Sequence, residues 1–167
     1  MDDSDVLKKL AELSKRYAHF PDGRVNYTGT DYAPAVQVFI RVNGEILLLK
    51  RSDKVANYKG KWNSIGGFID APMPIQEKAI GEAEEELGIT RSMIKQVITG
   101  DPYELYDPAI KKTWLICPFI LELNSKPEIR LDFENSEYRW IKPGNITKFD
   151  RVFGLERSYA ACTKGKE

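Results

Sequence analysis

The order of the predicted elements favours an α+β domain in which helices cover both faces of one sheet. Apolar runs that alternate or continue like strands occupy most of the chain, and one strong helix interrupts them over residues 74–87. A doubly wound parallel sheet would instead need strands and helices in regular alternation. The length of 167 residues suits one domain with a substantial apolar core.

An amphipathic helix is predicted near the N-terminus, over residues 4–18. Its apolar side chains recur at helical spacing, and Ser4 is the candidate N-cap. A loop rich in turn residues follows. We therefore divide the chain into an N-terminal extension, residues 1–32, and a main domain, residues 33–167. The apolar stripe of the helix leaves two uses open, packing on the main domain or forming a homodimer.

A β-hairpin is the next predicted element. Residues 35–42 and 45–50 have strand patterns, and Asn43-Gly44 between them is a dipeptide that strongly favours a two-residue hairpin turn. Residues 62–69 form a further strand pattern. Beyond the central helix, we expect strands over residues 94–100, 112–123 and 137–141, and a short helix over residues 155–162.

Composition excludes several classes of protein. The 25 basic residues equal the 25 acidic ones, so the chain lacks the positive excess expected of an extended nucleic-acid interface. Two cysteines are too few for a disulfide framework. Neither a signal peptide nor an apolar run of about 20 residues is visible, so we expect no membrane association and a cytoplasmic location.

The central helix carries an acidic cluster, with five glutamates and one basic residue between positions 77 and 86. A helical wheel separates a converging set from a solvent-facing set: Glu82, Glu85 and Glu86 against Glu77 and Glu84. Like charges at this spacing repel, and the C-terminal end of a helix disfavours anions. A solvated acidic face is one interpretation. A bound divalent cation would remove both costs, and carboxylate oxygens favour Mg²⁺ or Mn²⁺ over zinc.

The segment from Gly67 to Ile89 resembles the Nudix box, whose pattern is G-x5-E-x7-R-E-U-x-E-E-x-G-U, where U is a bulky apolar residue. The matching positions, at the required spacing, are Gly67, Glu82, Glu85, Glu86, Gly88 and Ile89. Two positions differ, because Met73 and Gly81 stand where the family has Glu and Arg. The stretch from Trp62 to Gly67 is also similar to the family's Trp-x-x-Pro-Gly-Gly.

The resemblance implies a Nudix-like α/β/α sandwich with a mixed central sheet, joined here to the N-terminal helical extension. It further implies metal-dependent hydrolysis of a diphosphate linkage in a nucleoside-diphosphate derivative, with release of a monophosphate. The implied Mg²⁺ or Mn²⁺ ligands are the carboxylates of Glu82, Glu85 and Glu86 and the carbonyl of Gly66. A small nucleotide is thus the expected partner, and the Nudix box does not specify which one.

The same resemblance suggests roles for residues outside the helix. Glu85 and Glu86 are candidate catalytic residues together with Glu134, which precedes a late strand. Glu137 is the second choice for the base. For substrate binding, the resemblance suggests Arg51 as a phosphate contact. Tyr58 and Trp62 are added from the sequence itself, because they flank Lys59 and Lys61 and offer a stacking surface beside cations; packing in the core or on the surface is the alternative for Trp62.

Two other functions compete with hydrolysis. The loss of charge at Met73 and Gly81 is compatible with a catalytically weak module that binds nucleotides or has a regulatory role. An isopentenyl-diphosphate isomerase shares the fold but needs a cysteine upstream of the box, and no cysteine precedes Cys117. Substrate choice is expected to depend on the loop over residues 99–111 and on the N-terminal extension.

Overall fold

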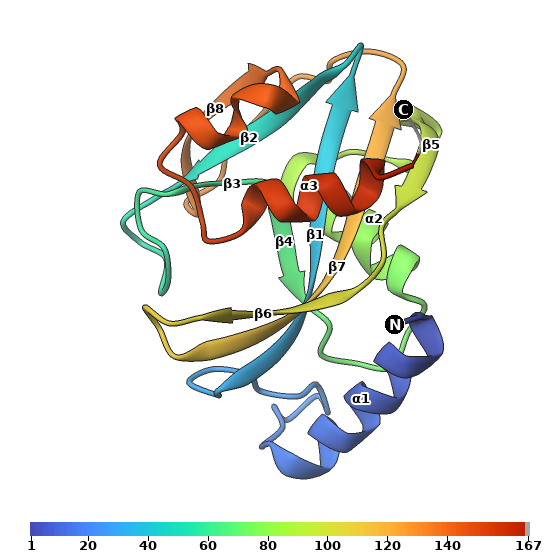
Figure 1. The fold of residues 1–167 in the computed structure, drawn as a ribbon, viewed down its shortest axis with the longest axis vertical. Helices are drawn as coiled ribbons and strands as arrows, with labels where there is room; N and C mark the ends of the chain where they lie inside the picture. Colours follow the sequence, from blue (N-terminus) through green and yellow to red (C-terminus); the bar gives the residue numbers. More distant parts are fainter. Residues whose placement is uncertain (166–167) are drawn as a thin grey trace.

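An eight-stranded mixed sheet forms the middle layer of the molecule (Figure 1). The computed structural model describes residues 1–165. The strands are β1 (Tyr32–Val42), β2 (Glu45–Arg51), β3 (Trp62–Asn63), β4 (Ile65–Phe68), β5 (Ile94–Thr99), β6 (Tyr103–Asp107), β7 (Lys112–Leu123) and β8 (Asn135–Ile141). The helices are α1 (Asp3–Arg16), α2 (Ile75–Leu87) and α3 (Leu155–Thr163), with short 3-10 helices η1 (Arg91–Met93) and η2 (Pro143–Lys148).

The two long strands β1 and β7 run parallel through the centre of this sheet. Their pairing extends from Tyr32 opposite Thr113 to Arg41 opposite Glu122. The other pairings between these strands are antiparallel: β2 and β4 join β1, β5 and β6 join β7, and β3 and β8 join β2. The sheet is therefore mixed, as the resemblance implied.

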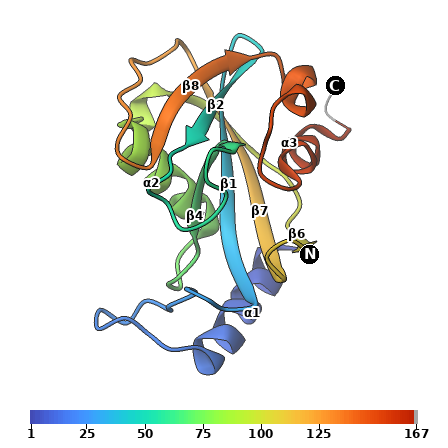
Figure 2. The ribbon, with the colours of Figure 1, turned by 90° about the vertical axis from the view of Figure 1, so that its left-hand side faces the viewer.

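Helices cover both faces of the sheet, with α2 on one side and α3 on the other (Figure 2). One apolar cluster lies between the sheet, α2 and α1, and includes Ile75, Ala83 and Leu121. A second cluster lies between the opposite face, η2 and α3, and includes Phe39 and Leu155. The predicted α/β/α sandwich is thus confirmed.

The N-terminal extension packs on the main domain. Val6 and Leu10 of α1 are buried in the first cluster, and Leu13 joins Tyr27 in a third cluster. The helix is capped by Asp2, whose side chain accepts from the backbone N–H of Asp5, and not by Ser4 as predicted. The apolar stripe of α1 is thus used within the chain. Within residues 1–165, no helix combines the length and apolarity needed to cross a membrane.

Two strand predictions need correction. The run over residues 62–69 is divided at Ser64, because β3 pairs with β2 whereas β4 pairs with β1. The segment over residues 99–111, predicted as a loop, contains β6. This strand pairs with β7, and the turn between them includes Lys111 at φ 52. Its alternation of buried and exposed residues is too short to stand out in the sequence.

Candidate active site

Helix α2 has defined ends and one buried apolar face, and these features direct its carboxylates towards a cleft. Pro74 precedes the first turn, where its missing N–H costs no hydrogen bond. Gly88 ends the helix in the left-handed conformation at φ 66, which glycine adopts without a steric penalty. The stripe formed by Ala79, Ala83 and Leu87 is buried against the sheet. The opposite side of the helix therefore borders open space.

That space is a cleft of about 1020 Å³. Its walls bring together segments that lie far apart in the sequence: α2, β4, the end of β2, the loop that follows β2, and the loop before β8. Of the residues predicted for the site, the cleft is lined by Glu82, Glu85, Glu86, Gly66, Arg51, Tyr58 and Glu134. Trp62 does not line it.

Glu82 lies against the backbone of Gly67. A Cβ atom added at Gly67 would overlap the Glu82 carboxyl group, so the glycine allows the side chain to lie where it does. Oε1 of Glu82 also accepts from Nζ of Lys78 at 2.6 Å. Burial raises the pKa of Glu82, Lys78 lowers it, and the neighbouring charges of Glu85 and Asp70 raise it further. Lys78 was not among the predicted site residues, although its position four residues before Glu82 is a helical-spacing signal.

Glu86 has the most perturbed carboxyl group of the cleft. Its pKa is raised to about 8, chiefly by burial and further by the charges of Glu82, Glu134 and Asp132. Arg51 opposes the shift. Carboxylates this close together repel one another, and a cation bound in the cleft would offset that repulsion.

Arg51 and Glu134 are neighbours because β2 pairs with β8. The pairing places Arg51 opposite Asn135, after an irregularity between Lys50 and Arg51. The backbone N–H of Ser52 donates to the carbonyl of Glu134 at 2.7 Å, which holds the loop before β8 against the end of β2. The charges of Glu134 and Glu86 both act on Arg51, whose pKa is nevertheless lowered, chiefly by burial. Arg51 is thus a cation close to two acidic residues of the cleft.

Tyr58 connects the loop after β2 to the β6–β7 hairpin. Its hydroxyl donates to Oδ2 of Asp107 at 2.6 Å and accepts from Nε1 of Trp114 at 3.2 Å. Asp107 is only 2% exposed, so this hydrogen bond satisfies a buried carboxylate. Tyr58 has a positive φ of 57, which is unusual for a bulky residue. The network holds this strained residue at the wall of the cleft. The partners Asp107 and Trp114 were not predicted, since the sequence carries no signal of this long-range contact.

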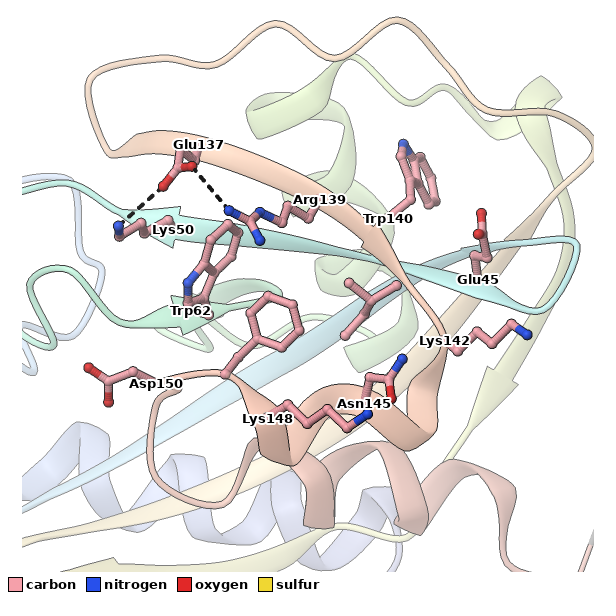
Figure 3. A pocket seen from close by; sticks show the side chains of 12 residues that line it. Glu45, Lys50, Trp62, Glu137, Arg139, Trp140, Lys142, Asn145, Lys148 and Asp150 are labelled. Atoms are coloured by element: carbon pink, nitrogen blue, oxygen red, sulfur yellow. Dashed lines mark ion pairs between the residues drawn. The ribbon is translucent and has the colours of Figure 1, made fainter.

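Trp62 lies in a second, shallow pocket of about 770 Å³ (Figure 3). It is 7% exposed, its ring packs against Phe149 with centroids 5.3 Å apart, and the guanidinium of Arg139 lies over it. Successive side chains of a strand point to opposite faces, so the neighbouring Asn63 lines the cleft instead. The structure therefore separates Trp62 from the other predicted substrate-binding residues.

Glu137 borders the same second pocket, where it pairs with Nζ of Lys50 at 3.1 Å (Figure 3). Of the two candidate bases, only Glu134 lies in the cleft. Glu77, expected on the solvent side of the helix, also lines the cleft and forms an ion pair with Arg91. The expectation that Glu77 faces only solvent is therefore corrected. The angle around the helix does not explain the difference, because Glu84 lies within about 20° of Glu77 on the wheel and does not line the cleft; the position along the helix decides it.

The donor set of the cleft suits a hard divalent cation. Its side-chain donors from α2 are carboxylate oxygens, and Gly66, whose carbonyl the resemblance implies as a further ligand, lines the same cleft. In the described part of the chain, no three His, Cys, Asp or Glu side chains are gathered tightly enough to enclose a metal ion. Glu82, Glu85 and Glu86 thus fit Mg²⁺ or Mn²⁺ by the chemistry of their oxygens and by lining one cleft, but their side chains would have to converge to bind an ion.

Comparison with known proteins decides the family. A family model of the NUDIX domain matches residues 31–162. The chain belongs to the Nudix family. An uncharacterised Nudix hydrolase of Pseudomonas aeruginosa is 24% identical over 143 residues, which cover 84% of this chain and 80% of that protein. The nucleoside triphosphatase NudI of Salmonella agona is 26% identical over 122 residues, which cover 66% of this chain and 82% of NudI.

A solved structure shows the same fold. The crystal structure of a MutT NUDIX hydrolase from Burkholderia pseudomallei matches with a TM-score of 0.60 and 21% identity, over 78% of this chain and 97% of that one. Nudix hydrolases are pyrophosphohydrolases that act on nucleoside-diphosphate derivatives and generally need divalent cations such as Mg²⁺ or Mn²⁺. The Nudix chain described here is therefore an enzyme of the class that acts on phosphoric anhydride bonds.

Proposed function

We propose that this Nudix enzyme hydrolyses the diphosphate linkage of a small nucleoside-diphosphate derivative in a metal-dependent reaction and releases a monophosphate. The observation that carries the proposal is the meeting of the three box carboxylates, Arg51 and Glu134 at one cleft. The perturbed carboxyl group of Glu86 supports it, because strongly shifted pKa values concentrate at functional sites. The activity of NudI, a nucleoside triphosphatase, is compatible with the substrate class.

Each residue has a task in this reaction. Glu82, Glu85 and Glu86, with the Gly66 carbonyl, would hold Mg²⁺ or Mn²⁺, which supplies charge neutralisation on the phosphate oxygens. Arg51 binds an oxygen of the diphosphate through its guanidinium. Glu134 accepts the proton of the water that attacks phosphorus. The P–O bond of the anhydride breaks as the new one forms, and the leaving phosphate carries away the negative charge.

Glu134 suits the role of base because of where its loop is held. Its backbone is fixed to Ser52, next to the cation Arg51. Its charge also acts on Glu86, one of the proposed metal ligands, and both residues line the cleft. Glu137, paired with Lys50 at the second pocket, lacks that position.

The test is hydrolysis of a panel of nucleoside di- and triphosphates and their derivatives in the presence of Mg²⁺. The expected result is release of a monophosphate from at least one of them. Glu86→Gln and Glu134→Gln should each lower the rate by about 100-fold or more. Glu84→Gln is the matched control, because Glu84 is an exposed carboxylate of the same helix outside the cleft. Full activity in Glu86→Gln would refute the proposal.

Calorimetric titration with Mn²⁺ separates hydrolysis from the alternative of a module that only binds nucleotides. A hydrolase of this design binds Mn²⁺ in the absence of substrate. Nucleotide binding without Mn²⁺ binding or turnover would favour the alternative, which the uncharged Met73 and Gly81 of the box motivate.

A further inference from the structure

Lys78 and Glu82 form an enclosed ion pair at the wall of the cleft. Nζ of Lys78 lies 2.6 Å from Oε1 of Glu82, and the two side chains are only 18% and 12% exposed. The pair Lys9–Glu12 on α1 is a useful contrast, because its atoms are 3.9 Å apart and its side chains are 38% and 73% exposed. An exposed pair of that kind contributes little, whereas an enclosed charge pair fixes the geometry of both groups.

The oxygen that Lys78 contacts is also the one enclosed by Gly67. The place where a Cβ atom of Gly67 would stand is filled by the carboxyl carbon and Oε1 of Glu82. Oε1 therefore has Lys78 on one side and the Gly67 backbone on another. Oε2 is the oxygen of Glu82 left for a further partner.

Lys78 is the cation that balances Glu82. The neighbouring charges of Glu85 and Asp70 are negative, and Lys78 is the positive group that acts on this carboxylate. Position 81, one residue before Glu82, is a glycine, and a Cβ atom there would meet no atom within 4 Å. Among residues 1–165, Lys78 forms no ion pair except that with Glu82.

We propose that Lys78 is a positioning residue that holds Glu82 as a one-oxygen ligand, with Oε1 bound to Lys78 and Oε2 presented to the divalent cation. The inference rests on the proposed function, since it assigns a task to one of the metal-binding carboxylates. It implies that Glu82 contacts Lys78 and the cation at the same time, through different oxygens. If Lys78 instead stood in the place of the cation, removal of its charge would strengthen metal binding.

The experiment measures Mn²⁺ affinity by isothermal titration calorimetry on the full chain without substrate. Lys78→Met removes the charge and should weaken Mn²⁺ binding by about 10-fold or more, the usual effect of losing a partner that orients a metal ligand. Lys78→Arg retains a cation and should restore most of the affinity. Lys9→Met, which breaks the exposed pair on α1, is the matched control and should bind Mn²⁺ like the wild type.

Each outcome has a defined meaning. Unchanged or tighter Mn²⁺ binding in Lys78→Met overturns the proposal, and tighter binding identifies Lys78 as a competitor of the cation. If metal-free Lys78→Met unfolds at a temperature similar to that of the wild type, and Lys78→Arg restores Mn²⁺ affinity, Lys78 positions Glu82 and does not merely stabilise the fold. If Lys78→Met fails to fold, Lys78→Gln replaces it with the same expected direction. Absence of Mn²⁺ binding in the wild type would overturn both the proposed function and this inference, whereas binding that is equal in wild type and variant overturns this inference alone.

Discussion

Replacing Glu86 by Gln should stabilise the metal-free protein, and the gain should grow with pH. The pKa of Glu86 rises from 4.5 to about 8 on folding. Between these two values the folded state binds more protons than the unfolded state, so wild-type stability falls as the pH rises through this window. Glutamine does not titrate and avoids that loss. The difference between variant and wild type is therefore close to zero at pH 4.5 and reaches its plateau above pH 8.

The magnitude follows from the linkage between pKa and stability. Each pKa unit corresponds to about 1.4 kcal/mol, so the loss accumulated between pH 4.5 and pH 7 is at most about 3 kcal/mol. For a chain of this length, 1 kcal/mol moves the unfolding midpoint by roughly 2–4 °C. Glu86→Gln should thus unfold up to about 6–12 °C above the wild type at pH 7.

The assay is thermal unfolding in a chelator at several pH values from 4.5 to 8.5, at constant ionic strength. Glu84→Gln serves as the control and should run parallel to the wild type at every pH, since Glu84 is exposed outside the cleft. At pH 8, added Mn²⁺ should stabilise the wild type more than Glu86→Gln, because a bound cation stabilises only the state that binds it. A constant difference between Glu86→Gln and wild type across the pH range would refute this reasoning.

Three further substitutions test other parts of the structure. Gly67→Ala should weaken Mn²⁺ binding in a calorimetric titration, because the new methyl group displaces the Glu82 carboxyl; an unchanged affinity would show that Glu82 can move freely. Tyr58→Phe should lower the free energy of unfolding by about 1–3 kcal/mol, measured with urea, since it leaves the buried Asp107 without its hydroxyl donor; no change would mean that water replaces the donor. Leu13→Ala should cost about 2–5 kcal/mol in the same assay, as expected for a core leucine, and an effect near zero would contradict the packing of the N-terminal extension.

Local features of the fold followed from the sequence because short-range rules govern them. Asn43-Gly44 forms the turn between β1 and β2, with both residues at positive φ. The helix over residues 74–87 is found within one residue of its predicted bounds, because Pro74 and Gly88 mark its ends. Its carboxylates share one face since three- and four-residue spacings do so in any helix. The box spacing was also sufficient to indicate the family.

Only the tertiary structure decided which of the remaining candidates meet these carboxylates. Arg51 and Glu134 come together through the pairing of β2 with β8, and sequence patterns do not specify a partner strand or its register. The same pairing places Glu137 at the second pocket. Trp62 also lies there, because successive side chains of β3 point to opposite faces of the sheet. Periodicity predicts that a strand has two faces, but the packing of the whole sheet determines which face borders the cleft.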